Sequence, residues 1–537
     1  MLAVGWHSAC SSIRVLLQTC RALAVPLVLC LILGIAAVRA QRGPIVVPAG
    51  GDLQAAIDAA RPGDVILLAA GATYVGNFVL PPTSGSSYIT IRSDADPSRF
   101  PAGRRVTPDQ APLMAVLRSP NTSPALATAP GAHHWRLQWL MFRANAGGIG
   151  DIITLGDGST AQRDLASVPH HFVLDGLIIR GDAAAGQKRG IALNSADTII
   201  RNSDIRDIKA VGQDSQAICG WNGPGPYVIE NNYLEAAGEN VMFGGADPAI
   251  PNLVPSDIVF RRNYVTKPLA WRADGSPWTV KNLFELKNAQ RVLIEWNVFE
   301  HSWAAAQTGY AILLTPMNQD GAAPWTVVAD ITFQHNLVRR SASGINMLGQ
   351  DYQAPSRETR RITIRENLFS EIDAERWGGD GRFLLIGDGP SDVTIDHNTV
   401  LQTGTFLLLY GKQNGRPRTV QNMRLTNNLG LHNEYGILGE EYPLGSASIE
   451  AYLPGSEVRA NVLGGGDERR YPPGNLFPST DALFAEFSGA AAGDYRLRAG
   501  SALRTAGTNG SMMGANVEAL LRGLPRGDSP SGTTRPR

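Results

Sequence analysis

The chain has 537 residues, and its 48 basic side chains balance 48 acidic ones. This balance excludes the strong overall field typical of proteins that bind nucleic acid or a charged membrane surface. Length alone is compatible with two to four domains, but an elongated repeat fold of the same length forms one.

The first 40 residues predict an export signal. Arg14 and Arg21 precede an apolar run, and Val38-Arg39-Ala40 places small residues at the cleavage positions. The run is also about as long as a short membrane span, so an uncleaved anchor is the alternative. Cleavage would give a secreted, periplasmic or cell-surface protein that is no longer held at the membrane.

The cysteines fit such a protein only if it is stabilised without disulfides. Three of the four lie in the export segment, so Cys219 alone remains after cleavage. The mature chain then has no intramolecular disulfide and no cysteine-based zinc site.

Residues 41–100 predict an N-terminal cap and the first coils of a repeat. The segment GGDLQAAIDAARPGDVILL gives a short amphipathic helix around residues 52–60, then a turn and a strand. A helix placed there would cover strand edges that otherwise invite aggregation.

A repeat of about 30 residues follows, over residues 101–510. Nine segments share a frame in which an apolar residue stands three positions before an asparagine, and usually another stands five before it. The period-two alternation indicates a strand, and a second apolar strand precedes it in most units. Such a unit fits one coil of a parallel β-solenoid. The asparagines are Asn202, Asn232, Asn263, Asn297, Asn336, Asn367, Asn398, Asn428 and Asn461.

An asparagine at the same place in each coil has a physical explanation. Asparagine tolerates the left-handed backbone of a sharp bend, and an inward amide satisfies backbone groups that would otherwise be buried unpaired. We therefore expect an asparagine ladder along the solenoid. Residues 511–537 are expected to form a C-terminal tail.

With this repeat, the chain resembles the right-handed parallel β-helix proteins of the pectate lyase-like superfamily. Residues 50–80 are similar to their N-terminal entry, and residues 493–507 to a common closing segment. The resemblance implies an all-β, right-handed parallel β-helix over roughly residues 45–510. It leaves the activity open, because the superfamily holds lyases, hydrolases, esterases and epimerases.

The segment KNLFELK, residues 281–287, carries the candidate chemistry. Strand alternation sends Phe284 and Leu286 inward and places Glu285 and Lys287 on the outer face, with Lys281 just before them. Two long spacings of the repeat, 34 and 39 residues, fall around this segment. We expect the inserted residues to wall a groove over residues 239–325.

Neighbouring segments add groups that suit a polysaccharide partner. Glu239 and His301 join the lysines and Glu285 as candidate catalytic residues. Tryptophan rings stack on sugar faces while polar groups act on the linkage or on uronate carboxylates. The candidate substrate-binding residues are Trp271, Arg272, Trp303 and Gln307.

Two reactions fit these groups. In β-elimination, Lys287 or Lys281 removes the proton beside a uronate carboxylate, and a cation such as Ca²⁺, held by Glu239 and Asp247, offsets the charge. In hydrolysis, two carboxylates act across the bond, with Glu239 and either Glu285 or Asp247 as candidates. The lysines in the cluster favour a polysaccharide lyase over a glycoside hydrolase. We also expect the protein to be a monomer.

Structural roles account for the same residues without catalysis. Glu285 and Lys287 could form a surface ion pair, and His301 could be a loop residue. The protein would then be a glycan-binding or structural β-helix. The pairs His133-His134 and His170-His171 resemble metal ligands, but we assign them no metal because no acidic partner stands in a matching frame.

Overall fold

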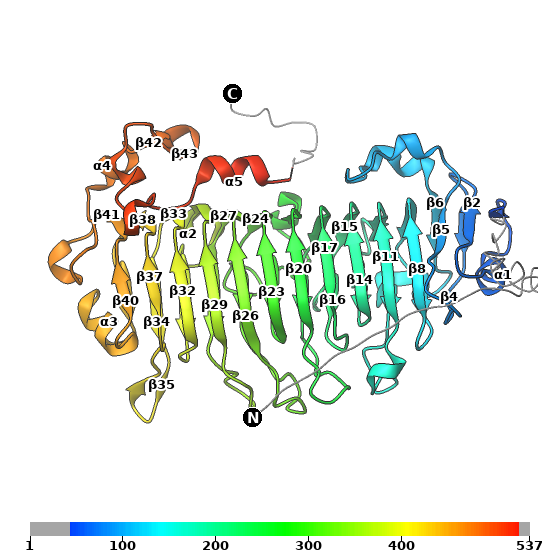
Figure 1. The fold of residues 1–537 in the computed structure, drawn as a ribbon, viewed down its shortest axis with the longest axis horizontal. Helices are drawn as coiled ribbons and strands as arrows, with labels where there is room; N and C mark the ends of the chain where they lie inside the picture. The colour runs from blue at the N-terminus through cyan, green and yellow to red at the C-terminus, as the bar shows by residue number, and fades with distance from the viewer. Residues whose placement is uncertain (1–42, 526–537) are drawn as a thin grey trace, which may run out of the picture. The chain divides into compact units, whose positions relative to one another are not determined.

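The computed structural model describes residues 43–525 (Figure 1). The predicted export signal and the final segment RGDSPSGTTRPR lie outside the described residues. Within the described part, no helix is both long and apolar enough to cross a bilayer.

Three long parallel sheets build a right-handed parallel β-helix, as predicted. Sheet A has 14 strands from β1 (Ile45–Val47) to β40 (Glu457–Arg459), and sheet B has 13 from β3 (Thr73–Val75) to β41 (Val462–Gly464). Sheet C has 12 strands from β4 (Phe78–Leu80) to β39 (Ile437–Gly439). One coil passes through A, B and C in turn, as in β23 (Ala289–Glu295), β24 (Val298–Ser302) and β25 (Tyr310–Leu314).

The predicted helical cap is α1 (Leu53–Ala59). The Asp52 carboxylate accepts from the Ala55 N–H at 3.0 Å and so caps its first turn. Leu53 and Ile57 are buried, and the helix contacts β1 and β4 at the end of the coils. The cap therefore closes the apolar interior at its N-terminal end.

Aromatic side chains stack along the interior from coil to coil. Phe260, Phe299, Phe333 and Phe369 are fully buried, and successive ring centroids lie 6.1, 5.8 and 6.4 Å apart. Burial of each such side chain contributes about 1.5–3 kcal/mol. The rings alternate between the two sheets, with Phe260 and Phe333 in sheet A and Phe299 and Phe369 in sheet B, so they pack across the bend from one coil to the next.

The asparagine ladder runs along the bend between sheets A and B. The Asn297 N–H and Nδ2 both donate to Asn336 Oδ1, at 3.0 and 2.9 Å, and Nδ2 also donates to the Phe260 carbonyl. The same pattern links Asn232 to Asn461 coil by coil, and it ends on Asn475. Buried backbone groups at each bend are thus satisfied.

Asn202 is not a member of this ladder, contrary to the prediction. Ser203 occupies the ladder position in that coil, since its N–H donates to Asn232 Oδ1 at 2.9 Å. Asn202 itself has φ 56°, and the residue before each ladder asparagine, such as Arg262 or Trp296, shares this left-handed conformation. The bend therefore needs two adjacent residues, one left-handed and one with an inward amide.

The C-terminal part folds back over sheet B. A hairpin of β42 (Phe487–Gly489) and β43 (Asp494–Leu497) is followed by α5 (Val517–Gly523), which lies above the coils in Figure 1. Val517 and Leu520 are buried in one cluster with Leu337 and Leu368 of sheet B. Residues 511–525 of the expected tail thus pack on the β-helix.

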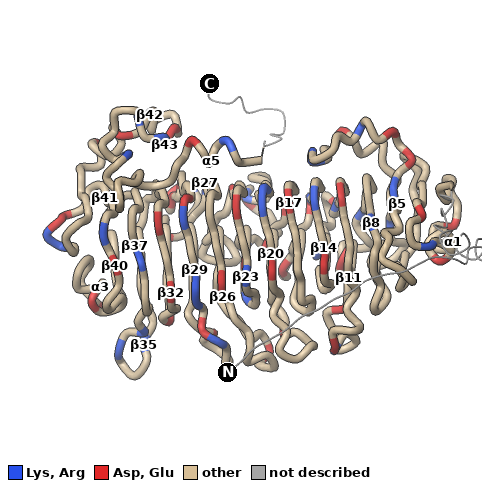
Figure 2. Tube along the Cα trace, viewed as in Figure 1, with Lys and Arg blue, Asp and Glu red and all other residues tan. Residues whose placement is uncertain are grey.

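Three further helices lie among the later coils, and charges are mixed along the whole solenoid. The helices are α2 (Ala374–Trp377), α3 (Ser446–Tyr452) and α4 (Thr480–Phe484). Figure 2 shows basic and acidic residues interspersed along the described coils. The trace of the described residues thus shows no long run of one charge sign in this view.

Candidate active site on sheet C

The KNLFELK segment contains one strand of sheet C, β22 (Phe284–Leu286). This strand pairs with β19 (Glu239–Phe243) on one side and with β25 on the other. Phe284 and Leu286 are fully buried in the core, as predicted. Glu285 points outward but is only 1% exposed, so it is not a solvated surface group.

Glu239 is a buried carboxylate at the centre of this face. Its Oε2 accepts from Gln216 Nε2 at 2.8 Å, and its Oε1 lies 3.3 Å from Lys281 Nζ. Burial, followed by the charges of Glu285 and Asp214, raises the pKa of Glu239 above its usual range. This carboxyl group is therefore able to hold a proton at a higher pH than an exposed glutamate.

Lys281 bridges two carboxylates. Its Nζ lies 2.5 Å from Asp214 and 3.3 Å from Glu239. Burial alone would lower the pKa of Lys281, but the neighbouring carboxylates outweigh it and the pKa is raised. Lys281 thus holds its proton firmly, which makes it a poor general base and a suitable fixed positive charge.

Lys287 and Glu285 belong to a second chain of contacts. Lys287 Nζ lies 3.7 Å from Glu285 Oε1, and Asn282 Nδ2 donates to Glu285 Oε2 at 2.7 Å. The same Asn282 amide donates to Gln307 Oε1 at 3.1 Å. Gln307, predicted to bind substrate, is thereby tied to the carboxylate beside Lys287. The Lys287 side chain is 15% exposed, so it is largely buried beside the Glu285 carboxylate.

Asn282 Oδ1 is a buried oxygen on this face that accepts no hydrogen bond from the described residues, whereas Glu239 Oε1 has the Lys281 ammonium 3.3 Å away. Asn282 and Glu239 each stand two residues before a paired position of β22 and β19. With Glu285, these residues supply carboxylate and amide oxygens, the ligand atoms that Ca²⁺ prefers. The chemistry of these oxygens therefore suits a cation, which would share Glu239 with Lys281.

Asp247, the other predicted metal ligand, has a different role. Its Oδ2 accepts from the N–H groups of Asp320 and Ala322, at 3.1 and 2.8 Å. Among the described residues, no hydrogen bond or ion pair joins Asp247 to Glu239. Asp247 therefore holds the loop between β25 and β26 (Val328–Gln334), and Asn282 is the better partner of Glu239.

The long inserted loops flank this face, but the predicted tryptophans are buried in them. Trp271 and Trp303 are 6% and 4% exposed and form one apolar cluster with Trp377. They are not free to stack on a sugar, because three loops converge and bury their rings against one another. Arg272 is exposed and lies over the Trp377 ring at 5.0 Å.

His301 lies in sheet B, apart from the lysines. Its Nε2 is 3.5 Å from Glu300 Oε1, and its ring packs 5.7 Å from Trp377. Burial lowers the pKa of His301 despite the opposing charge of Glu300. Over residues 43–525, no hydrogen bond or ion pair joins His301 to Lys287 or Glu285.

The sequence analysis missed the residues that extend the site along sheet C. Arg189 donates to Asp151 at 2.8 Å and to Gln216 at 3.2 Å, and Gln216 donates to Glu239. A polar row thus crosses four coils. Aligning the coils on this strand rather than on the ladder asparagine would have placed these side chains in register.

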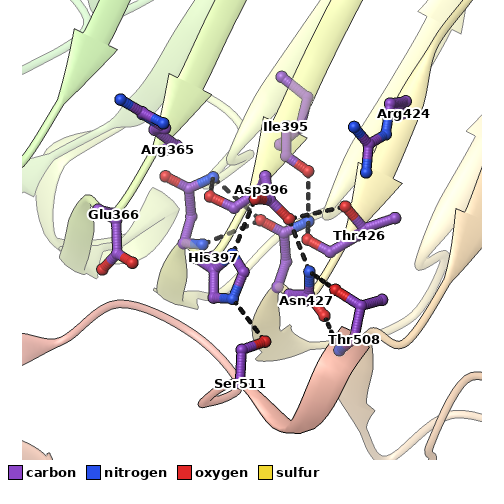
Figure 3. Close-up of polar contacts among 12 residues, drawn as sticks. Arg365, Glu366, Ile395, Asp396, His397, Arg424, Thr426, Asn427, Thr508 and Ser511 are labelled. Carbon is purple, nitrogen blue, oxygen red and sulfur yellow. Dashed lines mark hydrogen bonds and ion pairs between the residues drawn. The ribbon is translucent and has the colours of Figure 1, made fainter.

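A second polar constellation, shown in Figure 3, joins Asp396, His397 and Ser511. His397 Nδ1 lies 2.8 Å from Asp396 Oδ2, and its Nε2 lies 3.0 Å from Ser511 Oγ. The order of contacts is that of a catalytic triad, but the Ser511 backbone also closes a turn with Gly507 and Thr508. We interpret these contacts as a clamp that fastens the C-terminal segment to the coils.

A cavity lies at the corner between sheets A and B. Its volume is about 820 Å³, and it runs between residues 100–106 and residues 522–525. Both charges line it, including Arg201, Arg262 and Glu230. It shares no residue with the cluster on sheet C, and its walls combine these two segments with residues of several coils, so no local sequence pattern indicates it.

Known proteins match this chain in fold rather than in sequence. No family model matches it, and no curated protein does. The PL6 family alginate lyase AlyGC aligns at 14% identity and TM-score 0.49, over 81% of this chain and 53% of its own. A mutant of AlyGC gives TM-score 0.52 at 14% identity, over 92% and 60%. This chain thus spans little more than half the length of AlyGC.

One further neighbour matches along nearly its whole length. A mannuronic acid specific polysaccharide family 6 lyase from human gut microbiota has TM-score 0.50 at 12% identity, over 89% of this chain and 98% of that one. Similarity at this level of identity shows a shared fold. It confirms that the chain has a parallel β-helix fold.

Proposed function

We propose that this protein is a polysaccharide lyase that cleaves a uronate-containing glycan by β-elimination. The observation that carries the proposal is the cluster on sheet C, where Lys287 lies beside the buried Glu285, one coil after the buried Glu239. Structural neighbours with this fold are named as polysaccharide family 6 lyases, one alginate lyase and one specific for mannuronic acid, which supports the choice of substrate.

Lys287 is the proposed base in this reaction. It removes the proton on the carbon beside the uronate carboxylate, the electron pair forms the new carbon–carbon double bond, and the glycosidic oxygen leaves. The leaving oxygen takes up a proton, so a new unsaturated end and a new hydroxyl end result. Lys281 keeps its charge and attracts the substrate carboxylate to the face.

A cation such as Ca²⁺, when bound, would neutralise the uronate carboxylate and so make the neighbouring proton more acidic. Glu239, Asn282 and Glu285 are the residues that would hold it. Gln307 orients the Asn282 amide, and Gln216 orients the Glu239 carboxylate through its own hydrogen bond.

Glycoside hydrolysis is the second candidate, and the raised pKa of Glu239 supports it. Burial and Glu285 raise the pKa of Glu239, which suits a general acid, and Glu285 would act as the second carboxyl group. A glycan-binding protein without activity would use the same face. In all three cases we propose a monomer that is exported by its N-terminal segment and acts outside the cytoplasm.

The test is a substrate panel on the full chain. We would incubate it with alginate, polymannuronate, pectate and neutral β-glucan, with and without Ca²⁺, and follow unsaturated uronate by ultraviolet absorbance and new ends by a reducing-sugar assay. Unsaturated product from a uronate polymer is the expected result. Reducing ends without unsaturation would replace the lyase by the hydrolase, and retention of glycan without cleavage would leave a binding protein.

A further inference from the structure

Four histidines that are adjacent in pairs in the sequence come together on the outer face of sheet A. His133 and His134 begin β8 (His133–Gln138), and His170 and His171 begin β11 (His170–Asp175). The two strands pair in parallel with His170 opposite His133, so His171 lies opposite His134. The register thus stacks one pair directly on the other.

The backbone explains why both members of each pair face outward. In a regular strand, consecutive side chains point to opposite faces. His134 and His171 both have φ 58°, a left-handed conformation that breaks the alternation. Histidine is one of the few residues besides glycine that is enriched there.

The imidazole rings are close enough to share one ligand. The Nδ1 atoms of His133 and His134 lie 2.8 Å apart, and those of His170 and His171 lie 2.6 Å apart. Rings also stack between the coils, with centroids 4.9 Å apart for His133 and His170 and 4.4 Å for His134 and His171. One nitrogen from each of His134, His170 and His171 lies within 4.8 Å of the other two.

These separations suit a transition-metal ion. Imidazole nitrogens bind Zn²⁺ at about 2.0–2.1 Å, and tetrahedral geometry then places two ligand atoms about 3.4 Å apart. The neutral imidazole ring is the form that binds metals, through its unprotonated nitrogen. Small movements of the rings bring three nitrogens to the required spacing.

A carboxylate stands next to the cluster in the following coil. Asp197 in β14 (Ala196–Arg201) lies opposite His171 in the register, and its Oδ2 is 3.7 Å from His171 Nδ1. The sequence analysis assigned no metal because it found no acidic partner in frame, and Asp197 supplies one. A carboxylate beside a metal-binding histidine orients the ring and raises its basicity.

We propose that His134, His170 and His171 bind one divalent transition-metal ion such as Zn²⁺, with His133 as a fourth donor and Asp197 as the orienting carboxylate. The histidines are partly buried, and the side chains of His171 and Asp197 are 41% and 43% exposed, so an ion reaches the site from solvent. The site joins two adjacent coils near the N-terminal end and is separate from the cluster on sheet C.

The experiment measures metal retention by the full chain after removal of metals with a chelator. Zn²⁺ or Co²⁺ is added, the protein is dialysed, and bound metal is counted by elemental analysis. The visible spectrum of Co²⁺ reports its geometry. We expect one ion per chain with a four-coordinate nitrogen-ligand spectrum, and a higher melting temperature with the ion than without it.

Substitutions then locate the ion. The double variant His134→Gln/His171→Gln should lose more than about a hundredfold in affinity, and Asp197→Asn about tenfold. The control is His335→Gln, because His335 is also a left-handed residue whose ring stacks on Trp296 at 4.4 Å but has no second histidine beside it. His335→Gln should bind like the parent. Either a parent that retains no ion after dialysis or a double variant that binds as tightly as the parent would overturn the proposal.

Discussion

Lys287 Nζ and Glu285 Oε1 lie 3.7 Å apart on the outer face of sheet C, where the carboxylate is almost fully buried and the lysine side chain is 15% exposed. The pair is therefore not a solvated surface ion pair. It places the proposed base beside a buried carboxylate, one coil after Glu239, and the proposed chemistry depends on this arrangement.

Replacing Lys287 tests its role as the base. We expect Lys287→Ala to lower kcat by about 10²- to 10⁴-fold, which is the usual contribution of general base catalysis, and to lower the melting temperature because the buried Glu285 loses its ion-pair partner. The matched control is Lys412→Ala, because Lys412 pairs with Glu441 through an exposed contact at the hairpin of β35 (Lys412–Gln413) and β36 (Arg416–Pro417). Equal activity of the two variants would remove Lys287 from the mechanism.

Neutralising Glu239 should separate stability from activity. Burial and Glu285 disfavour its charged form, so Glu239→Gln should raise the free energy of unfolding at pH 8 above that of the parent while activity falls. The sign follows from linkage: the folded state holds this proton more tightly, so the parent loses stability as pH rises above the ordinary glutamate range. Urea unfolding at pH 5 and pH 8 measures both values, and a variant less stable than the parent at pH 8 would contradict this account.

Removal of a cation should affect the parent and an Asn282 variant differently. A chelator should lower activity, and added Ca²⁺ should restore it, because Asn282 Oδ1 then has a partner. Asn282→Ala should need a higher Ca²⁺ concentration for half-maximal activity. Titrations of activity against Ca²⁺ measure this shift. Full activity of the parent in the presence of a chelator would exclude the cation from the reaction.

The ladder should make a large local contribution to stability. In Asn297→Ala, the Asn263 amide groups, the Phe260 carbonyl and Asn336 Oδ1 all lose a buried partner. At about 1–3 kcal/mol for a buried group left unpaired, we expect a loss of about 3 kcal/mol or more in urea unfolding. Gln353→Ala, which removes an exposed loop amide, should change stability by less than about 0.5 kcal/mol. Similar values for the two variants would show that the ladder is not needed.

The clamp in Figure 3 should respond to pH. Hydrogen bonds from His397, Thr426 and Asn427 outweigh burial and lower the pKa of Asp396 to about 2, while Asp396 overcomes the burial of His397 and raises its pKa. The contribution of Asp396 to the stability of the folded state is present above its ordinary pKa near 3.8 and is lost as pH falls toward 2. The His397 contribution is complete below 6.5 and is lost as pH rises through its elevated pKa.

Hydrogen exchange of residues 503–525 measures this clamp. Protection should be greatest between about pH 4 and 6.5, after correction for the intrinsic exchange rate. His397→Gln should reduce the dependence on pH. A dependence that is equally steep in His397→Gln would assign it to other groups.

The fold was predictable because the same pattern of residues recurs in each coil of the repeat. Successive asparagines and the apolar residues before them fixed the coil length, the strand before the bend and the ladder from Asn232 onward. The assignment of Asn202 failed because the left-handed residue and the ladder residue are adjacent, and asparagine suits both positions. The hydrogen bond from the Ser203 N–H to Asn232 Oδ1 shows that Ser203, and not Asn202, occupies the ladder position.

The site was predictable only where it depends on one strand. Alternation placed Glu285 and Lys287 on the outer face, but it gave no indication that neighbouring loops bury Glu285. Trp271 and Trp303 were expected at the surface, and they are buried because separate loops meet around them. Gln216 and the stacked histidines come from other coils, so their positions depend on register between strands rather than on local pattern.

The most direct test of the central claim compares product chemistry in two proteins. The parent and Lys287→Ala would be incubated with the uronate polymer that the parent degrades fastest, and the new chain ends identified by mass spectrometry. The account predicts unsaturated uronate ends from the parent and almost none from Lys287→Ala. Saturated ends that carry the mass of added water would contradict it and show that the carboxylates hydrolyse the glycan instead.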